Sequence, residues 1–326
     1  MAIIKYVDLF CGTGAFSLAM QNKSGAHCVF ANDMCPNSEI IYTANFPTHN
    51  FVNAKLEHIP VEDVPEHDLL IAGFPCQSFS VEGSKKGFDD DRGQAFFRLL
   101  DVIKHRQPKA FVLENVKHLI NHDKGKTFKT ITSLLECEGY IVVHKVLNTA
   151  TYTDVPQRRE RVFIVGFKNE DSARHFAYPE PEPKTRAVED MLEAVPDVRY
   201  YYDARYKIYA QLKRDMRTQK TFYRYKGTTR QFASELCPTL TAGMGGGGHN
   251  VPLLLTSKNE IRKLSPRECF NFQTFPATFI LPANISDRGL YRLAGNAVSY
   301  AVVERLLNNV VKALLGNYDT PSQSAG

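Results

Sequence analysis

Gly73-Phe74-Pro75-Cys76-Gln77-Ser78 directly follows the apolar run Asp68-Leu69-Leu70-Ile71-Ala72. An apolar run ended by glycine and proline is typical of a buried β-strand and the loop after it. Cys76 therefore lies just past the carboxyl end of a predicted strand, the edge where ligands bind in open α/β sheets. Proline fixes its own φ, so Pro75 limits the conformations open to the thiol. Taken alone, Cys76 is better explained as one buried cysteine among the seven of the chain.

The first residues predict a nucleotide-binding unit. An apolar run over 3–10 leads into Asp8-Leu9-Phe10-Cys11-Gly12-Thr13-Gly14, and a helix over 15–21 and a strand ending at Asp33 follow. Gly12 and Asp33 are 21 positions apart, the interval at which a carboxylate meets a ribose hydroxyl. Because the turn lacks the third glycine of a dinucleotide fingerprint, a single adenosine is favoured over NAD.

Strands and helices alternate over the first half of the chain. Further strands are predicted at 50–56, 68–73, 109–114, 140–147 and 161–167, and further helices at 95–106, 127–138 and 300–315. This order predicts a doubly wound, mostly parallel α/β sheet. If strands 68–73 and 109–114 are neighbours, Cys76 and Glu114 face one pocket, with Asp33 beside it. The polar loop 80–93 next to Cys76 is a candidate lid.

Composition narrows the class of protein. The 326 residues carry a net charge of +5, and the charged start, Met1 to Tyr6, is too short for a signal peptide. We find no apolar stretch long enough to span a membrane. The seven cysteines include no Cys-x-x-Cys pair, which argues against a zinc site or a disulfide framework, and we expect no metal. A reduced, cytoplasmic compartment is therefore predicted.

The second half differs in composition. The stiff segment Pro179-Glu180-Pro181-Glu182-Pro183 predicts a domain boundary near 178. Residues 199–230 carry ten Lys or Arg against two Asp, and seven of the fifteen tyrosines, a composition typical of a nucleic-acid surface. A solvated amphipathic helix is the alternative. Five glycines fall within positions 243–248, either as a flexible linker or because backbone approaches a ligand there. Ser265 and Pro266 predict the start of a helix.

Taken together, these blocks resemble the DNA (cytosine-5) methyltransferases, in particular the compact bacterial enzymes of restriction–modification systems. The matching blocks run in the family's order and span nearly the whole chain: Asp8 to Gly14, Gly73 to Ser80, Glu114-Asn115-Val116, Gln157-Arg158-Arg159-Glu160-Arg161, Arg262 to Glu268 and Gly295-Asn296-Ala297-Val298. The segment between the arginine block and Arg262 corresponds to the family's target-recognition region, and Thr239-Leu240 matches its internal signature.

The resemblance implies S-adenosyl-L-methionine as the methyl donor, S-adenosyl-L-homocysteine as the product, and a cytosine flipped out of duplex DNA as the target. Cys76 would add to cytosine C6 while Glu114 protonates N3, with Arg161 and Arg159 holding the pyrimidine O2 and the flanking phosphate. The implied cofactor residues are Phe10, Cys11, Gly12, Thr13, Gly14, Ala15, Asp33, Met34, Leu56, Gly73, Pro75, Asn296 and Ala297. The implied DNA-binding residues are Ser80, Glu82, Arg224, Arg230, Thr239, Leu240, Gly245 and His249.

Three positions depart from the family pattern. Ala15 stands where many members have a third glycine, Met34 where an aromatic residue is common, and Asn53, Lys55 or Leu56 where an acidic residue follows the third strand. We expect a catalytic domain of residues 1–178 completed by the helix within 291–316, a target-recognition domain of 179–290, and a flexible tail of 317–326. We expect a monomer that needs no bound restriction endonuclease. The alternatives are a tRNA cytosine-5 methyltransferase and a catalytically silent DNA-binding relative.

Overall fold

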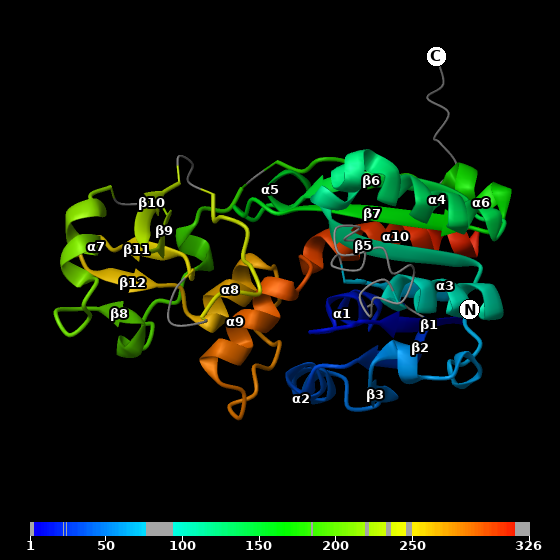
Figure 1. Ribbon diagram of the computed structural model, residues 1–326, viewed down its shortest axis with the longest axis horizontal. Coiled ribbons are helices and arrows are strands. Elements are labelled where there is room, and N and C mark those ends of the chain that lie inside the picture. The colour runs from blue at the N-terminus through cyan, green and yellow to red at the C-terminus, as the bar shows by residue number, and fades with distance from the viewer. Residues whose placement is uncertain are drawn as a thin grey trace, which may run out of the picture.

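Two β-sheets organise the molecule. The computed structural model of the chain describes residues 3–21, 23, 25–75, 94–183, 185–218, 222–232, 236–245 and 250–316. Within these ranges one sheet has seven strands and the other has five, and they lie at opposite ends of the long axis (Figure 1). Cys76, the loop over 80–93 and His249 lie outside the described residues, as do the other positions of 76–93 and 246–249.

The seven-stranded sheet confirms the predicted doubly wound, mostly parallel fold. Its strands in spatial order are β3 (Phe51–Asn53), β2 (Ala26–Asp33), β1 (Ile4–Leu9), β4 (Leu69–Ala72), β5 (Ala110–Val116), β7 (Glu160–Phe167) and β6 (Ile141–Asn148). Strands β1 to β5 are parallel, whereas β7 runs antiparallel to β5 and β6. The reversal of β7 was not predicted. It brings the residues just before β7 to the edge where β5 ends.

Helices cover both faces of this sheet because alternate strand residues point to opposite sides. In β5, Val112 packs into one core and Phe111 and Leu113 into the other. One face is covered by α1 (Ala15–Gln21), α2 (Pro36–Asn45), α5 (Thr149–Tyr152), α6 (Glu170–His175) and α10 (Tyr300–Leu315), and the other by α3 (Gln94–Arg106) and α4 (Lys126–Cys137). Helix α10 packs against α1, so the end of the chain returns to the first βαβ unit.

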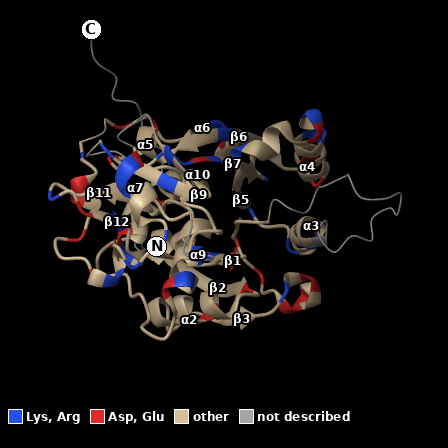
Figure 2. Cartoon of the chain, turned by 60° about the vertical axis from the view of Figure 1, so that its left-hand side comes forward, with Lys and Arg blue, Asp and Glu red and all other residues tan. Residues whose placement is uncertain are grey.

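The five-stranded sheet is antiparallel throughout and was not predicted. Its order is β10 (Thr228–Gln231), β9 (Phe222–Lys226), β11 (Leu253–Leu255), β12 (Ile261–Lys263) and β8 (Tyr201–Tyr202). It shares a small core with α7 (Tyr209–Asp215), built on Leu212, Tyr223 and Leu253. Helix α7 has the exposed residues Lys213 and Arg214 in its last turn, and basic positions on its ribbon are blue in Figure 2.

Helices α8 (Pro266–Phe272) and α9 (Asp287–Asn296) lie between the two sheets (Figure 1). Ser265 caps α8 through a capping box with Glu268, and Pro266 takes the first helical position, as predicted. Helix α9 spans position 290, at which the sequence predicted the end of the target-recognition domain. Short 3₁₀ helices complete the described chain: η1 (Leu56–His58), η2 (Val61–Asp63), η4 (Lys117–Gly125), η5 (Glu189–Met191) and η6 (Val198–Tyr200).

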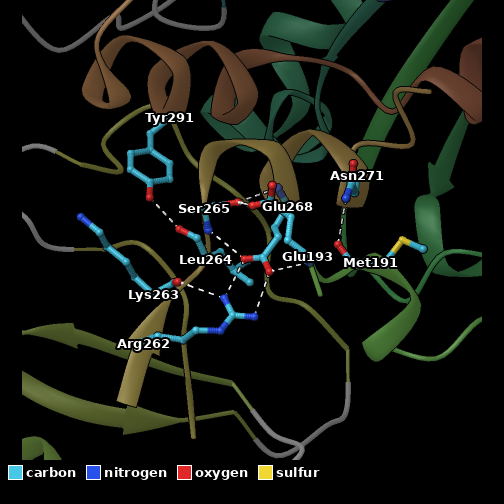
Figure 3. A network of polar contacts seen from close by, with 9 residues as sticks. All are labelled: Met191, Glu193, Arg262, Lys263, Leu264, Ser265, Glu268, Asn271 and Tyr291. Atoms are coloured by element: carbon cyan, nitrogen blue, oxygen red, sulfur yellow. Dashed lines mark hydrogen bonds and ion pairs between the residues drawn. The ribbon is translucent and has the colours of Figure 1, made fainter. Parts of the chain in front are cut away.

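A buried ion pair fixes the connection between the two sheets. Arg262 Nη1 and Nη2 each lie 2.8 Å from one oxygen of the fully buried Glu268 carboxylate (Figure 3). The same carboxylate accepts the backbone N–H groups of Ser265 and Glu193 at 2.8 and 2.9 Å. All the hydrogen-bonding capacity of Glu268 is thus directed at the chain around it, which ties the segment after η5 to β12 and α8.

Candidate active site

Three parallel strands deliver residues to one point at the carboxyl edge of the large sheet. Phe10 follows β1, Gly73 follows β4, and Glu114 lies near the end of β5. A Cβ atom built at Gly73 would lie 3.5 Å from Glu114 Oε2 and 4.0 Å from Phe10 O. The predicted neighbourhood of the strands before Cys76 and Glu114 is confirmed by the pairing of Ala72 with Leu113. Glycine at 73 therefore leaves room between the first turn and the carboxyl group.

The glycine-rich turn after β1 is held by Asp33. Gly12 N donates to Asp33 Oδ2 at 2.9 Å, and Cys35 N donates to Oδ1 at 2.8 Å. Phe10, Gly12 and Gly14 have φ of 54°, 55° and 80°, and a non-glycine residue in this region is strained, as often occurs at ligand sites. Burial raises the pKa of Asp33 above its usual value, against the lowering effect of its backbone donors.

This turn fits an adenosine-bearing cofactor. Within the described ranges, a Cβ built at Gly12 would meet only Phe10 O, at 4.0 Å, so the outer side of the turn is open. Met34 beside the carboxylate is 63% exposed, which leaves its apolar side chain free to cover a ring. Neither Lys55, which is exposed, nor Leu56, which is buried, supplies an acidic side chain after β3. Cys11, Thr13 and Ala15 are buried within or directly behind the turn.

Glu114 forms an ion pair with Arg161 in a largely buried environment. Arg161 Nε lies 3.0 Å from Glu114 Oε1, and both side chains are about one-seventh exposed (14% and 13%). The contact exists because β7 is antiparallel, so Arg161 at its start pairs with Val116 at the end of β5. Burial raises the pKa of Glu114 above its usual value, although Arg161 and Arg159 act to lower it. A carboxyl group in this state can hold a proton closer to neutral pH.

The Pro-Cys loop is anchored by a residue to which the sequence assigned no role of its own. Asn115, which is 2% exposed, donates through Nδ2 to Phe74 O at 3.0 Å and accepts from Val116 N at 2.8 Å. The feature of the sequence that could have pointed to Asn115 is its place in the Glu114-Asn115-Val116 block. Asn115 thereby fixes the backbone two residues before Cys76.

Arg159 is placed differently from Arg161. Its guanidinium is buried and donates to the carbonyl oxygens of Leu240, Gly295 and Ala297 at 2.9, 3.2 and 2.5 Å. Burial lowers its pKa well below the usual value. Arg159 therefore joins the arginine block to the recognition signature and to the end of α9, where Ala297 is buried and Asn296 is exposed.

The sequence-predicted DNA residues are divided between two settings. Thr239 and Leu240 lie against the arginine block, since Thr239 Oγ1 donates to Arg158 O at 2.6 Å. Arg230 is exposed on β10, whereas its partner in register on β9, Arg224, is half-buried. Gly245 has φ of 74°, and a Cβ there would lie 2.8 Å from the Tyr291 ring. Ser80, Glu82 and His249 lie outside the described residues, as Cys76 does.

Two classes of feature are not found in the described part of the chain. No group of three His, Cys, Asp or Glu side chains is arranged to hold a metal ion there. None of the helices there combines the length and apolarity that crossing a membrane requires.

Comparison with known proteins places this geometry in a family. Residues 4–312 match the family model described as C-5 cytosine-specific DNA methylase. The chain is 42% identical over 318 residues to Type II methyltransferase M.Bsp6I of Bacillus sp. (strain RFL6), covering 96% of this chain and 100% of that protein. It is 35% identical over 337 residues to Type II methyltransferase M.HpaII of Haemophilus parainfluenzae, covering 96% and 91%.

The fold resembles that of a solved methyltransferase structure. The crystal structure of the S. pombe Dnmt2 methyltransferase superposes with a TM-score of 0.76 at 20% identity, over 95% of this chain and 99% of that one. At that identity the likeness concerns the fold alone. The sequence matches, which extend over nearly the whole chain, carry the assignment. The chain therefore belongs to the C-5 cytosine-specific DNA methylase family and is a DNA cytosine-5 methyltransferase.

Proposed function

We propose that the edge formed by Phe10, Gly73 and Glu114 transfers a methyl group to C5 of a cytosine flipped out of a specific duplex sequence. The observation that carries this proposal is the Glu114–Arg161 pair beside Gly73, three residues before Cys76. A carboxyl group with a raised pKa next to an arginine suits proton transfer to a ring nitrogen. The target base must leave the duplex because C6 is inaccessible in the stack.

In the proposed reaction, the Cys76 sulfur forms a bond to cytosine C6 while the Glu114 carboxyl gives its proton to N3, which leaves C5 electron-rich. Arg161 then faces the Glu114 carboxylate and stabilises its charge. Once C5 carries the methyl group, a base removes the C5 proton and the bond between C6 and sulfur breaks, which restores the ring and the thiolate. Glu114 recovers the N3 proton.

S-Adenosyl-L-methionine, which supplies an electrophilic methyl group on sulfur when bound, would be held by the turn Phe10 to Ala15 and by the Asp33 carboxylate. Met34 and Leu56 would line the adenosine, and Gly73, Pro75, Asn296 and Ala297 the inner end of the site. The five-stranded sheet, within residues 179–290, would read DNA. We propose a monomer that works in the bacterial cytoplasm and protects DNA without a bound endonuclease.

The test is a mechanism-based trap. Duplex DNA carrying 5-fluorocytosine at the target should form a stable covalent adduct with the wild-type protein in the presence of cofactor, because fluorine cannot leave as a proton. Bisulfite sequencing of plasmid from expressing cells identifies the target first. The assignment of Cys76 is wrong if the adduct also forms with Cys76→Ala, or if the wild-type protein forms no adduct. If the protein methylates tRNA faster than duplex DNA, the proposed substrate is wrong and tRNA takes its place.

A further inference from the structure

Residues 237–240 are joined to the arginine block along their length. Cys237 N donates to Pro156 O and Arg158 N donates to Cys237 O, both at 2.8 Å. Thr239 Oγ1 donates to Arg158 O at 2.6 Å, and Arg159 Nη1 donates to Leu240 O at 2.9 Å. These four hydrogen bonds connect a segment of the recognition region to the chain that leads directly into β7. The second residue of β7 is Arg161, the partner of Glu114.

Arg224, from the five-stranded sheet, contacts the same segment. It lies on β9 of the five-stranded sheet, and its Nη2 donates to Thr239 O at 3.0 Å. Its guanidinium lies 5.6 Å from the centre of the Phe232 ring. The side chain is half-buried, and burial lowers its pKa. Arg224 thus already has a carbonyl oxygen and an aromatic face as partners, a structural setting that the sequence, which suggested a DNA contact for Arg224, did not indicate.

We propose that Arg224 is a positioning residue for catalysis, which fixes Thr239-Leu240 between the five-stranded sheet and the arginine block. The proposal rests on the proposed roles of Glu114 and Arg161. Loss of the Arg224 contact would let residues 237–240 shift on the arginine block and so misplace Arg161 relative to Glu114. Displacements of about 1 Å at reacting groups can cost on the order of 100-fold in rate. The defect would therefore appear in turnover and not in the electrostatic part of DNA binding.

Arg230 offers a matched contrast because it faces Arg224 across the β9–β10 pair and is exposed. Arg224→Ala should lower kcat at saturating DNA by about 10- to 100-fold, with the salt slope of DNA binding unchanged. Arg230→Ala should raise KM for DNA and reduce the salt slope by about one, the effect of one lost phosphate contact. Arg224→Lys, which keeps a donor for Thr239 O, should recover most of the lost kcat.

Thr239→Val provides a second route that keeps the side-chain volume and removes the hydroxyl bonded to Arg158. It should lower kcat in the same way, and the double variant with Arg224→Ala should lose less than the product of the two single effects. The rate of adduct formation with 5-fluorocytosine DNA separates the two proposals. If wild type forms no adduct, the proposed function fails. If wild type traps normally and Arg224→Ala traps at the same rate, or if Arg224→Ala changes only the salt slope, Arg224 is not a positioning residue.

Discussion

At the scale of single residues, the proposed chemistry depends on the protonation state of Glu114. In the proposed reaction the Glu114 carboxyl group gives a proton to the ring, and burial favours the protonated form while Arg161 favours the ionised one. Glu114→Gln should retain DNA binding but lose about 10²- to 10⁴-fold in kcat, since the amide cannot give up a proton. Glu160→Gln is the control, because Glu160 lies next to Arg161 on β7 but pairs with Lys117 near the surface. Near-normal single-turnover rates in Glu114→Gln would remove Glu114 from the reaction.

Asp33 has a structural contact that must be separated from its proposed role toward the cofactor ribose. Both carboxylate oxygens already accept backbone N–H groups, from Gly12 and Cys35. Asp33→Ala should weaken S-adenosylmethionine binding by about 1–3 kcal/mol, measured by calorimetry. Asp33→Asn retains one oxygen acceptor and should lose less. Equal affinities in wild type and Asp33→Ala would mean that the ribose is held elsewhere.

We expect Asp8 to make the stability of the protein depend on pH. It is fully buried below the glycine-rich turn, Oδ2 accepts from Ser17 Oγ at 2.7 Å, and Oδ1 has no hydrogen-bond partner among the described residues. Burial raises its pKa from 3.8 to about 7. A raised folded-state pKa means that the stabilising contribution is complete below about pH 4 and is lost as pH rises through about 7.

Asp8→Asn cannot ionise, so its stability should not show this loss. Relative to wild type, its free energy of unfolding should increase by about 2–3 kcal/mol between pH 5 and pH 8 in urea titrations. Parallel curves for the two proteins across that range would show that Asp8 does not titrate as its burial implies.

The sequence predicts the position, at the carboxyl edge of the sheet, of those candidate residues whose place follows from a single strand. Glu114 and Asp33 follow apolar runs and so lie at the carboxyl edge. The environment of Arg159 could not be predicted in this way, because its carbonyl partners are 81, 136 and 138 positions away along the chain. A sequence motif marks Arg159 as important without distinguishing a substrate contact from a bond to backbone.

At the scale of elements, dependence on distant parts of the chain also explains which strands and strand directions the sequence did not predict. The strands of the large sheet are apolar runs that periodicity identifies, but a run has no direction, so the reversal of β7 was not predicted. The strands of the small sheet are two to five residues long, and β10 reads Thr-Thr-Arg-Gln, with no apolar face to detect. Their register depends on contacts with α7 and with each other.

The packing of α9 on the recognition segment depends on Gly295. A Cβ atom at Gly295 would lie 2.2 Å from the carbonyl carbon and oxygen of Thr241 and 2.5 Å from Ala242 N, all backbone atoms that cannot move aside. Gly295→Ala should therefore lower the free energy of unfolding by roughly 1–3 kcal/mol. Gly243→Ala is the control, since no atom of the residues that the structure describes lies within 4 Å of a Cβ there. Equal unfolding midpoints for the two variants would contradict this account.

At the scale of the whole molecule, the connection between the two sheets depends on the buried Arg262–Glu268 pair. The side chains are 4% and 0% exposed, and Glu268 also accepts from the backbone of Glu193, which precedes the five-stranded sheet. Removing one member of a buried pair leaves the other charge without compensation, which costs about 3–5 kcal/mol. Arg262→Met and Glu268→Gln should each be strongly destabilising for this reason.

The double variant Arg262→Met/Glu268→Gln should be clearly less destabilised than the sum of the two single variants. It leaves no unpaired charge at this site, and the single amide oxygen at position 268 can still accept from one of the two backbone groups, Ser265 N or Glu193 N, which bond different oxygens of the Glu268 carboxylate. The exposed Arg205–Asp203 pair is the control, because solvent screens an ion pair at the surface and Arg205→Met should leave the unfolding midpoint nearly unchanged. Limited proteolysis should cut Arg262→Met within residues 185–200 faster than wild type, since the Glu268 carboxylate that accepts Glu193 N is left without its cationic partner. Additive free energies and an unchanged cleavage pattern would mean that packing of α8 and α9 holds the two sheets together without the ion pair.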